Sequence, residues 1–220
     1  SVTATGESVL RSTPLPGAIL TRTAKSHIRV GTFQYAVALG DKENLSQLLV
    51  YTVDRHYPEL RNADDLPYAF FQAVLDRQAD LVSRWMLVGF VHGVMNTDNV
   101  SVAGETIDYG PCAFLDVYHP ETVFSSIDHQ GRYAFQNQPS ITQWNLARLA
   151  ESLVQVVPGN PEDAVGKFVE ILETFPSCYE KYFQTGANAK LGLTTMEKED
   201  FAIYSDLLKI MEESQLDFTE

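Results

Sequence analysis

The stretch from residue 90 to residue 116 reads FVHGVMNTDNVSVAGETIDYGPCAFLD, and it decides the fold. It contains three metal-competent side chains, Asp98, Asn99 and Asp108, around residues 101–107, which we expect to form a small hairpin. Asn99 begins that hairpin and Asp108 follows its end, close enough to share an ion. Oxygen ligands of this kind suit Mg²⁺, which prefers one or two carboxylates plus substrate phosphates. The layout therefore predicts a site for phosphate chemistry.

The order of these residues matches a protein-kinase catalytic core, in which a His-x-Asp-x-x-x-x-Asn loop precedes a hairpin and an Asp-Phe-Gly metal ligand. His92 opens the loop, Asn99 falls at its eighth position, and residues 108–110 stand where Asp-Phe-Gly would. The third position, where a kinase keeps its proton-accepting Asp, holds Val94, which can neither accept a proton nor bind a cation. Asp98 supplies a carboxylate at the seventh position instead. The loop therefore still contains a carboxylate that could act as a base or bind a metal, at a different position.

Each of these side chains has a second interpretation. Asp108 could be a turn residue that hydrogen-bonds its own backbone, although the nearby Asn99 favours metal ligation. Asp98 could orient Asn99 rather than act as a base. We interpret His92 as structural, because no nucleophile lies near it in the sequence and a histidine at this position of a kinase loop braces the loop by hydrogen bonding.

A loop at residues 128–132 could be mistaken for a catalytic dyad, since Asp128 and His129 are adjacent and Arg132 follows. Neighbouring residues in one loop rarely face each other. We expect these side chains to brace the loop or to form a substrate-side surface.

Several long runs of the chain resemble the selenoprotein O family. The runs are His92 to Asn99, Thr106 to Pro111, Asp128 to Ala134, Leu15 to Arg22 and Ser26 to Phe33. The family consists of kinase-like proteins that bind ATP in a flipped orientation and transfer AMP to hydroxyl side chains of other proteins. The similarity extends along essentially the whole chain, and motifs of this length are more specific than a kinase triplet.

The resemblance implies a role for each candidate site residue. Arg22 and Arg29 would hold the nucleotide phosphates, although strand and loop arginines taken alone are usually solvated or ion-paired; the planar fork of arginine donates to two phosphate oxygens at once. Asn99 and Asp108 would bind Mg²⁺ or Mn²⁺, and Asp98 would take the proton of the attacking hydroxyl.

The implied function is transfer of AMP from ATP to Ser, Thr or Tyr hydroxyls of proteins. Two other classes stay open. A catalytically silent nucleotide-binding or scaffold pseudokinase module would need no base. A conventional phosphotransferase would need a carboxylate at the third loop position, where Val94 stands.

Family members are about twice this length, so the resemblance predicts a fragment that is inactive on its own. The predicted fold class is α+β, protein-kinase-like and truncated. Residues 1–40 would form the end of the N-lobe and the hinge, and residues 41–220 a helical C-lobe that is incomplete at its C-terminus. Strand edges without partners invite pairing, so we expect residues 1–40 to pack as a small sheet on the helical lobe or to associate between copies.

Composition restricts the partners. A formal net charge of −13 and a pI near 4.7 argue against nucleic acid and anionic membranes, since both are bound by basic patches. The apolar runs are too short to span a bilayer, and residue 1 does not begin a signal peptide. Cys112 and Cys178 are expected to be free thiols in a reducing compartment. We therefore expect a cytoplasmic protein if the source is bacterial and a mitochondrial one if it is eukaryotic.

The pattern of apolar and breaking residues predicts the remaining elements. Asp41 is a candidate N-cap, Pro67 begins a long helix, and Pro158, Pro176 and Gly192 mark breaks. We expect a hairpin of residues 1–5 with 8–13 around Gly6-Glu7, a strand at 17–23, and helices at 32–39, 41–57, 66–88, 139–157, 161–175, 177–190 and 195–214.

Overall fold

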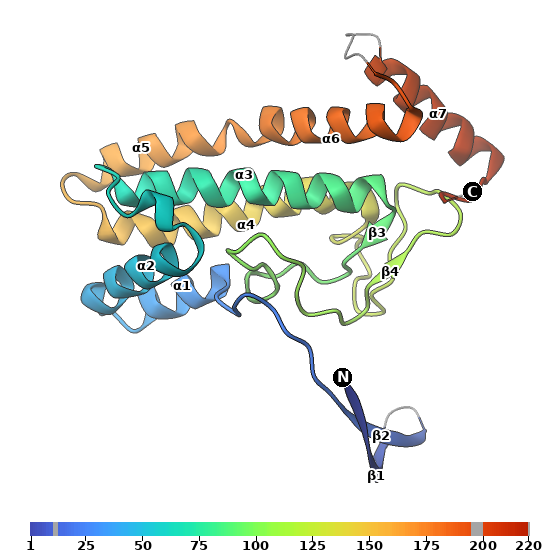
Figure 1. Cartoon of the computed structure of the whole chain (residues 1–220), viewed down its shortest axis with the longest axis horizontal. Helices are drawn as coiled ribbons and strands as arrows, with labels where there is room; N and C mark the ends of the chain where they lie inside the picture. Colours follow the sequence, from blue (N-terminus) through green and yellow to red (C-terminus); the bar gives the residue numbers. More distant parts are fainter. Residues whose placement is uncertain (11–12, 195–199, 220) are drawn as a thin grey trace.

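The computed structural model describes residues 1–10, 13–194 and 200–219, and it is an α+β fold in which helices dominate (Figure 1). The main elements are β1 (Val2–Leu10), β2 (Pro14–Leu20), α1 (Val30–Ala38), α2 (Lys42–His56), α3 (Leu66–Leu87), β3 (Phe90–Val91), β4 (Ala113–Phe114), α4 (Gln138–Leu153), α5 (Pro161–Leu172), α6 (Phe175–Leu191) and α7 (Asp200–Ser214). The predicted class is confirmed at this level. Among the described residues, no helix has the length and apolar character needed to cross a membrane.

Helix α3 is the centre of the helical part, and it packs against α4, α5 and α6. Its apolar stripe is buried: Phe70, Phe71, Val74 and Leu75 are completely inaccessible. Burial of a large apolar side chain contributes roughly 1.5–3 kcal/mol. The stripe therefore fixes α3, and the end of α3 delivers the chain to the stretch that begins at Phe90.

The predicted starts of the helices are largely confirmed. The carboxylate of Asp41 accepts the backbone N–H groups of Glu43 and Asn44, so it caps α2. Pro67 lies in the first turn of α3, where its missing N–H costs nothing. Pro176 is a correction: it lies inside the first turn of α6 rather than in a break before it. Of the helix predicted at 195–214, residues 195–199 lie outside the described residues.

The N-terminal hairpin differs from the prediction. Gly6 and Glu7 do not form its turn: β1 continues through them to Leu10 and pairs antiparallel with β2, with a register shift between Ala4 and Ser8. Gly6 has φ of 75°, a conformation that lets a glycine form a bulge inside a strand. The strand predicted at 17–23 therefore begins earlier, at Pro14, and ends at Leu20.

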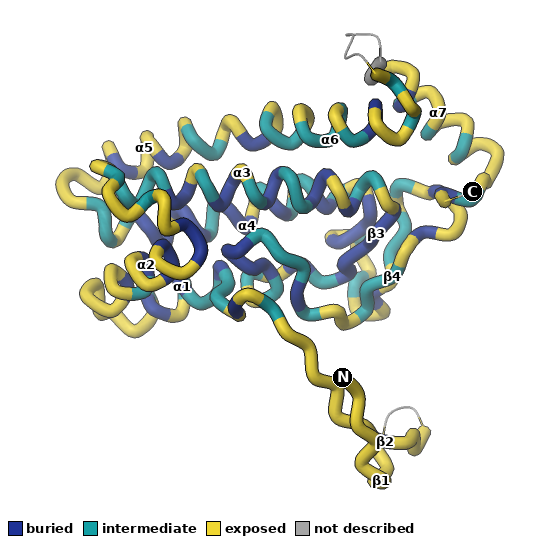
Figure 2. The backbone as a smooth tube through the Cα atoms, viewed as in Figure 1, coloured by how far each residue is buried: buried dark blue, intermediate teal, exposed yellow. Residues whose placement is uncertain are grey.

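The β1–β2 sheet stands apart from the helices (Figure 1). Every residue of β1 is exposed, as Figure 2 shows, and Gly17 is the buried position of β2. The first of the two alternatives for residues 1–40, a sheet packed on the helical part, is therefore wrong for this hairpin, and association between copies stays a prediction. Helix α1, by contrast, is packed against α4 and buries Val30 and Phe33.

Residues 88–137 contain little regular structure. Strands β3 and β4 are two residues long and pair Phe90 with Phe114 and Val91 with Ala113. The hairpin predicted at 101–107 is reduced to one bridge between Val100 and Thr106, with a turn between them. The chain is instead tied across to residues 28–30, because the backbone N–H groups of Val30 and Val102 donate to Val100 and Ile28.

Candidate functional site

His92 is almost completely buried, and it joins the two halves of the candidate site. Its Nε2 lies 2.8 Å from the carbonyl oxygen of Ile107, the residue before Asp108. A carbonyl can only accept, so Nε2 carries the proton and Nδ1 can accept the N–H of Val94 at 3.4 Å. Burial lowers the pKa of His92 below its ordinary 6.5, which favours this neutral form. His92 is thus the structural brace that the sequence indicated.

Asp108 has an unusual backbone conformation and an incompletely satisfied side chain. Its φ of 57° is left-handed, a region in which Asp is tolerated better than most residues. Its Oδ2 lies 3.2 Å from Nη2 of Arg29. Yet Oδ2 of Asp108 and Nε of Arg29 are both buried and have no hydrogen-bond partner. Buried charged atoms in this state are costly, so both groups are suited to take up a further ligand.

The two predicted phosphate-binding arginines contact neighbouring residues, Asp108 and Tyr109. Arg29 pairs with Asp108, and the guanidinium of Arg22 lies 5.4 Å from the centre of the Tyr109 ring. The Tyr109 hydroxyl donates to the carbonyl oxygen of Thr106 at 2.9 Å, which fixes the ring. The fold therefore brings Arg22, Arg29 and Asp108 together, although some 80 residues separate the arginines from the aspartate in the sequence.

Asp98 and Asn99 lie in a short 3₁₀ turn, Thr97–Asn99, that packs on the start of α1. A Cβ added to Gly31 would lie 3.2 Å from the backbone nitrogen of Asp98, so only glycine fits without a shift. The side-chain Nδ2 of Asn99 donates to the carbonyl oxygen of Val94 at 3.0 Å, which leaves its Oδ1 free to bind a cation. Asp98 is exposed, and within the described residues its carboxylate makes no hydrogen bond or ion pair.

The donor set suits a cation that needs few protein ligands. Within residues 1–10, 13–194 and 200–219, no three His, Cys, Asp or Glu side chains are grouped so that they could hold a metal ion. Asn99 offers its amide oxygen, and Asp108 offers its carboxylate, whose Oδ2 is unsatisfied. Mg²⁺ bound with substrate phosphates fits this set, whereas a structural zinc site needs four protein ligands.

Three buried amide side chains hold the site in shape, and sequence reasoning missed them. Gln138 accepts the backbone N–H of His92 and donates to the carbonyl oxygen of Phe90, both at 2.9 Å. Gln78 donates to the carbonyl oxygen of Ser101 at 2.7 Å, and Asn145 donates to that of Met95 at 2.9 Å. All three occupy positions on the apolar faces of α3 and α4. A polar residue within an apolar stripe was the available signal.

The loop at residues 128–133 is braced as expected. The carboxylate of Asp128 accepts the backbone N–H groups of Arg132 and Tyr133, at 2.9 and 2.7 Å. The Tyr133 hydroxyl donates to Oδ1 of Asn96 at 2.6 Å. This second loop is thereby attached to the turn that carries Asp98.

Replacing Gln138 by Leu tests the amide brace. Leu fills a similar volume but leaves the His92 N–H and the Phe90 carbonyl without partners. Buried unsatisfied groups cost about 1–3 kcal/mol each, so we expect the free energy of unfolding, measured by urea denaturation, to fall by about 2–4 kcal/mol. The control is Gln47→Leu on the exposed face of α2, which should change it by less than about 0.5 kcal/mol. A small effect at Gln138 would show that the brace is unimportant.

The lowered pKa of His92 predicts a pH dependence of stability. Below pH 6.5 the unfolded chain binds a proton at this histidine while the folded chain does not, so the free energy of unfolding falls as the pH falls. His92→Gln retains a donor near the Nε2 position and removes the titration, so its stability should decline less between pH 6.5 and pH 5. Burial also lowers the pKa of His56, so part of the pH dependence of stability remains in the His92→Gln variant. His129→Gln, at an exposed position, should retain the full wild-type slope; equal slopes in both variants would contradict the account.

Comparison with known proteins found related sequences along the whole chain. The family model described as protein adenylyltransferase SelO matches residues 1–220. A protein nucleotidyltransferase YdiU from Syntrophotalea carbinolica is 53% identical over 219 residues, which is 100% of this chain and 44% of that protein. The YdiU proteins of Alcanivorax borkumensis and Anoxybacillus flavithermus are 55% and 54% identical over 219 residues, covering 100% of this chain and 45% and 46% of theirs.

The chain thus spans just under half the length of these curated relatives. Because the family model matches every residue from 1 to 220, the chain belongs to the SelO family.

Proposed function

We propose that the intact protein transfers AMP from ATP to Ser, Thr or Tyr hydroxyls of other proteins, with Mg²⁺ or Mn²⁺ as cofactor. The observation that carries the proposal is the contact of Arg29 with Asp108 and of Arg22 with the next residue, Tyr109. Two guanidinium groups beside an incompletely satisfied carboxylate suit a metal-bound polyphosphate. The relatives are named protein nucleotidyltransferases, which supports nucleotidyl transfer to a protein.

Arg29 and Asp108 neutralise each other when no nucleotide is present. Nucleotide phosphates would offer Arg29 stronger acceptors and free the Asp108 carboxylate for the cation, together with Oδ1 of Asn99. A bound Mg²⁺ supplies neutralisation of charge on the phosphate oxygens. Arg22, above the Tyr109 ring, adds a second positive charge for the triphosphate.

Asp98 is our candidate for the general base. The oxygen of the acceptor hydroxyl bonds to the α-phosphorus, the bond from that phosphorus to the bridging oxygen breaks, and pyrophosphate leaves with the electron pair. The hydroxyl proton passes to the Asp98 carboxylate, which is exposed and free to accept it. Such a base contributes on the order of 10² to 10⁴ in rate, and positioning by the arginines supplies the rest.

The placement of the chain in a two-lobed enzyme belongs to the same proposal. Residues 1–40 would complete an N-lobe and residues 41–220 a kinase-like C-lobe, with ATP between them. The exposure of every residue of β1 supports this placement, because a sheet in a complete lobe would be covered. We propose that these 220 residues alone do not catalyse the reaction.

ATP labelled separately at the α and γ positions tests the reaction class. The intact protein should leave label on a protein substrate from α-labelled ATP and none from γ-labelled ATP. Label from the γ position alone would mean a conventional kinase. Label from neither would favour a silent nucleotide-binding module.

Two isosteric substitutions separate the roles of the carboxylates. Asp98→Asn should lower kcat about 10²-fold or more and leave ATP affinity nearly unchanged, since a base acts in the transition state. Asp108→Asn retains a residue type tolerated at positive φ, and it should weaken Mg²⁺-dependent ATP binding as well, which calorimetry would measure.

Asp64→Asn, at an exposed position remote in sequence from the candidate site, is the control and should match the wild type. Equal and mild losses of turnover in the Asp98 and Asp108 variants would show that Asp98 orients Asn99 and is not the general base.

A further inference from the structure

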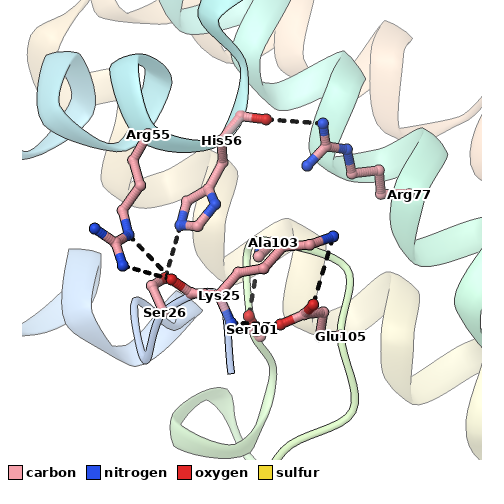
Figure 3. A network of polar contacts seen from close by, with 8 residues as sticks. All are labelled: Lys25, Ser26, Arg55, His56, Arg77, Ser101, Ala103 and Glu105. Atoms are coloured by element: carbon pink, nitrogen blue, oxygen red, sulfur yellow. Dashed lines mark hydrogen bonds and ion pairs between the residues drawn. The ribbon is translucent and has the colours of Figure 1, made fainter. Parts of the chain in front are cut away.

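A polar cavity, of about 400 Å³, lies beside the turn at residues 103–104 and does not include the residues of the candidate active site. It is lined by Lys25, Arg55, His56, Arg77, Asp80 and that turn. The cavity joins the end of α2, the middle of α3 and the segment before α1 (Figure 3). Three cationic side chains in one cavity are unexpected in a chain with a net charge of −13.

Arg55 is held in place by a neutral group. Its Nε and Nη2 both donate to the carbonyl oxygen of Lys25, at 3.1 and 2.6 Å. Within the described parts of the chain, Arg55 has no carboxylate partner at ion-pair distance. The guanidinium is therefore fixed while its charge is uncompensated.

Arg77 is fixed in a similar way from the opposite side of His56 (Figure 3). Its Nη2 donates to the His56 carbonyl oxygen at 2.8 Å, and its guanidinium lies 3.9 Å from the centre of the Tyr57 ring. Its stem packs against Gly104, where an added Cβ would lie 2.8 Å from the Cβ of Arg77. Arg77 likewise has no ion-pair partner in the part of the chain that the structure describes.

The nearby carboxylates are already engaged. Asp80 pairs with Arg84, whose Nη2 lies 2.9 Å from Oδ2 of Asp80. Glu105 accepts the Lys25 backbone N–H at 2.9 Å and lies 3.4 Å from Lys25 Nζ. Two arginine charges remain without a counter-ion in the cavity.

The positive charges of the cavity affect the pKa of His56. Burial lowers its pKa most, and the positive charges of Arg55 and Arg77 lower it further. Its Nε2 contacts the Ser26 hydroxyl at 2.7 Å, so the ring is held between the two arginines.

We propose that this cavity binds a small phosphorylated anion of the phosphate or pyrophosphate class. Two guanidinium groups fixed by backbone carbonyls offer their remaining N–H donors without having to be ordered first, and arginine matches phosphate oxygens with two parallel hydrogen bonds. A small anion fits better than an acidic protein segment. The positive field of the cavity reaches only a short distance, and beyond that distance the net charge of −13 repels a large acidic partner.

Calorimetric titration of the intact protein with sodium pyrophosphate, and separately with inorganic phosphate, tests the site. The solution contains EDTA and neither Mg²⁺ nor ATP, so failure here leaves the proposed AMP transfer untouched. Arg55→Gln and Arg77→Gln should each weaken pyrophosphate binding about tenfold or more, because each removes charge-assisted hydrogen bonds.

Arg61→Gln is the matched control: it removes one arginine charge just beyond α2, where Arg61 pairs with Asp54 outside the cavity. This variant should bind pyrophosphate as the wild type does, whereas Arg29→Gln reports any binding of pyrophosphate at the candidate active site. Wild-type affinity in the Arg55 and Arg77 variants, or loss of binding in Arg29→Gln alone, would overturn the proposal. Binding of a hexaglutamate peptide without binding of pyrophosphate would overturn it in favour of an acidic protein partner.

Discussion

The candidate site depends on one constraint: residues 88–137 must satisfy their buried backbone groups almost without a sheet. Strands β3 and β4 contribute two residues each. Unpaired buried N–H and C=O groups are expensive, so side chains take the place of a ladder. Gln138 serves two of these groups, and His92 serves the carbonyl of Ile107. A loop held from the helices in this way can keep a defined shape and still present its functional side chains outward.

The same arrangement explains the state of Asp108. His92 fixes the preceding carbonyl, and Asp108 itself has a left-handed backbone that few other residues tolerate. Its carboxylate then meets Arg29, which begins α1 and is bridged to Ser101. The ion pair leaves buried atoms unsatisfied on both partners. Each partner of this ion pair is therefore suited to bind a ligand of opposite charge, a cation at Asp108 and a phosphate at Arg29.

Local signals in the sequence predicted the helices well. Asp41 caps α2 and Pro67 opens α3 because both effects involve only neighbouring residues. The same local logic failed at Gly6-Glu7, where a glycine that can form a turn can also form a bulge in a continuing strand. It failed again at 101–107, where the segment bonds mainly to residues 28–30 rather than to itself.

The sequence indicated candidate residues for the site but not the contacts between them. The spacing of Asn99 and Asp108 indicated a metal site, and the family resemblance singled out Arg22 and Arg29. The ion pair of Arg29 with Asp108 joins residues far apart in the sequence, so no periodicity or spacing could reveal it. The amides of Gln78, Gln138 and Asn145 lie within apolar stripes and were missed, and only the fold shows which carbonyls they serve.

The central claim is that Asn99 and Asp108 share one divalent cation when nucleotide is bound. Anomalous diffraction from crystals of the intact protein grown with Mn²⁺ and ATP tests it most directly. The account predicts a peak about 2.2 Å from Oδ1 of Asn99 and from a carboxylate oxygen of Asp108, with Arg29 moved from Asp108 to the phosphates. A peak that touches neither residue, or nucleotide bound while the Arg29–Asp108 pair stays closed, would contradict it.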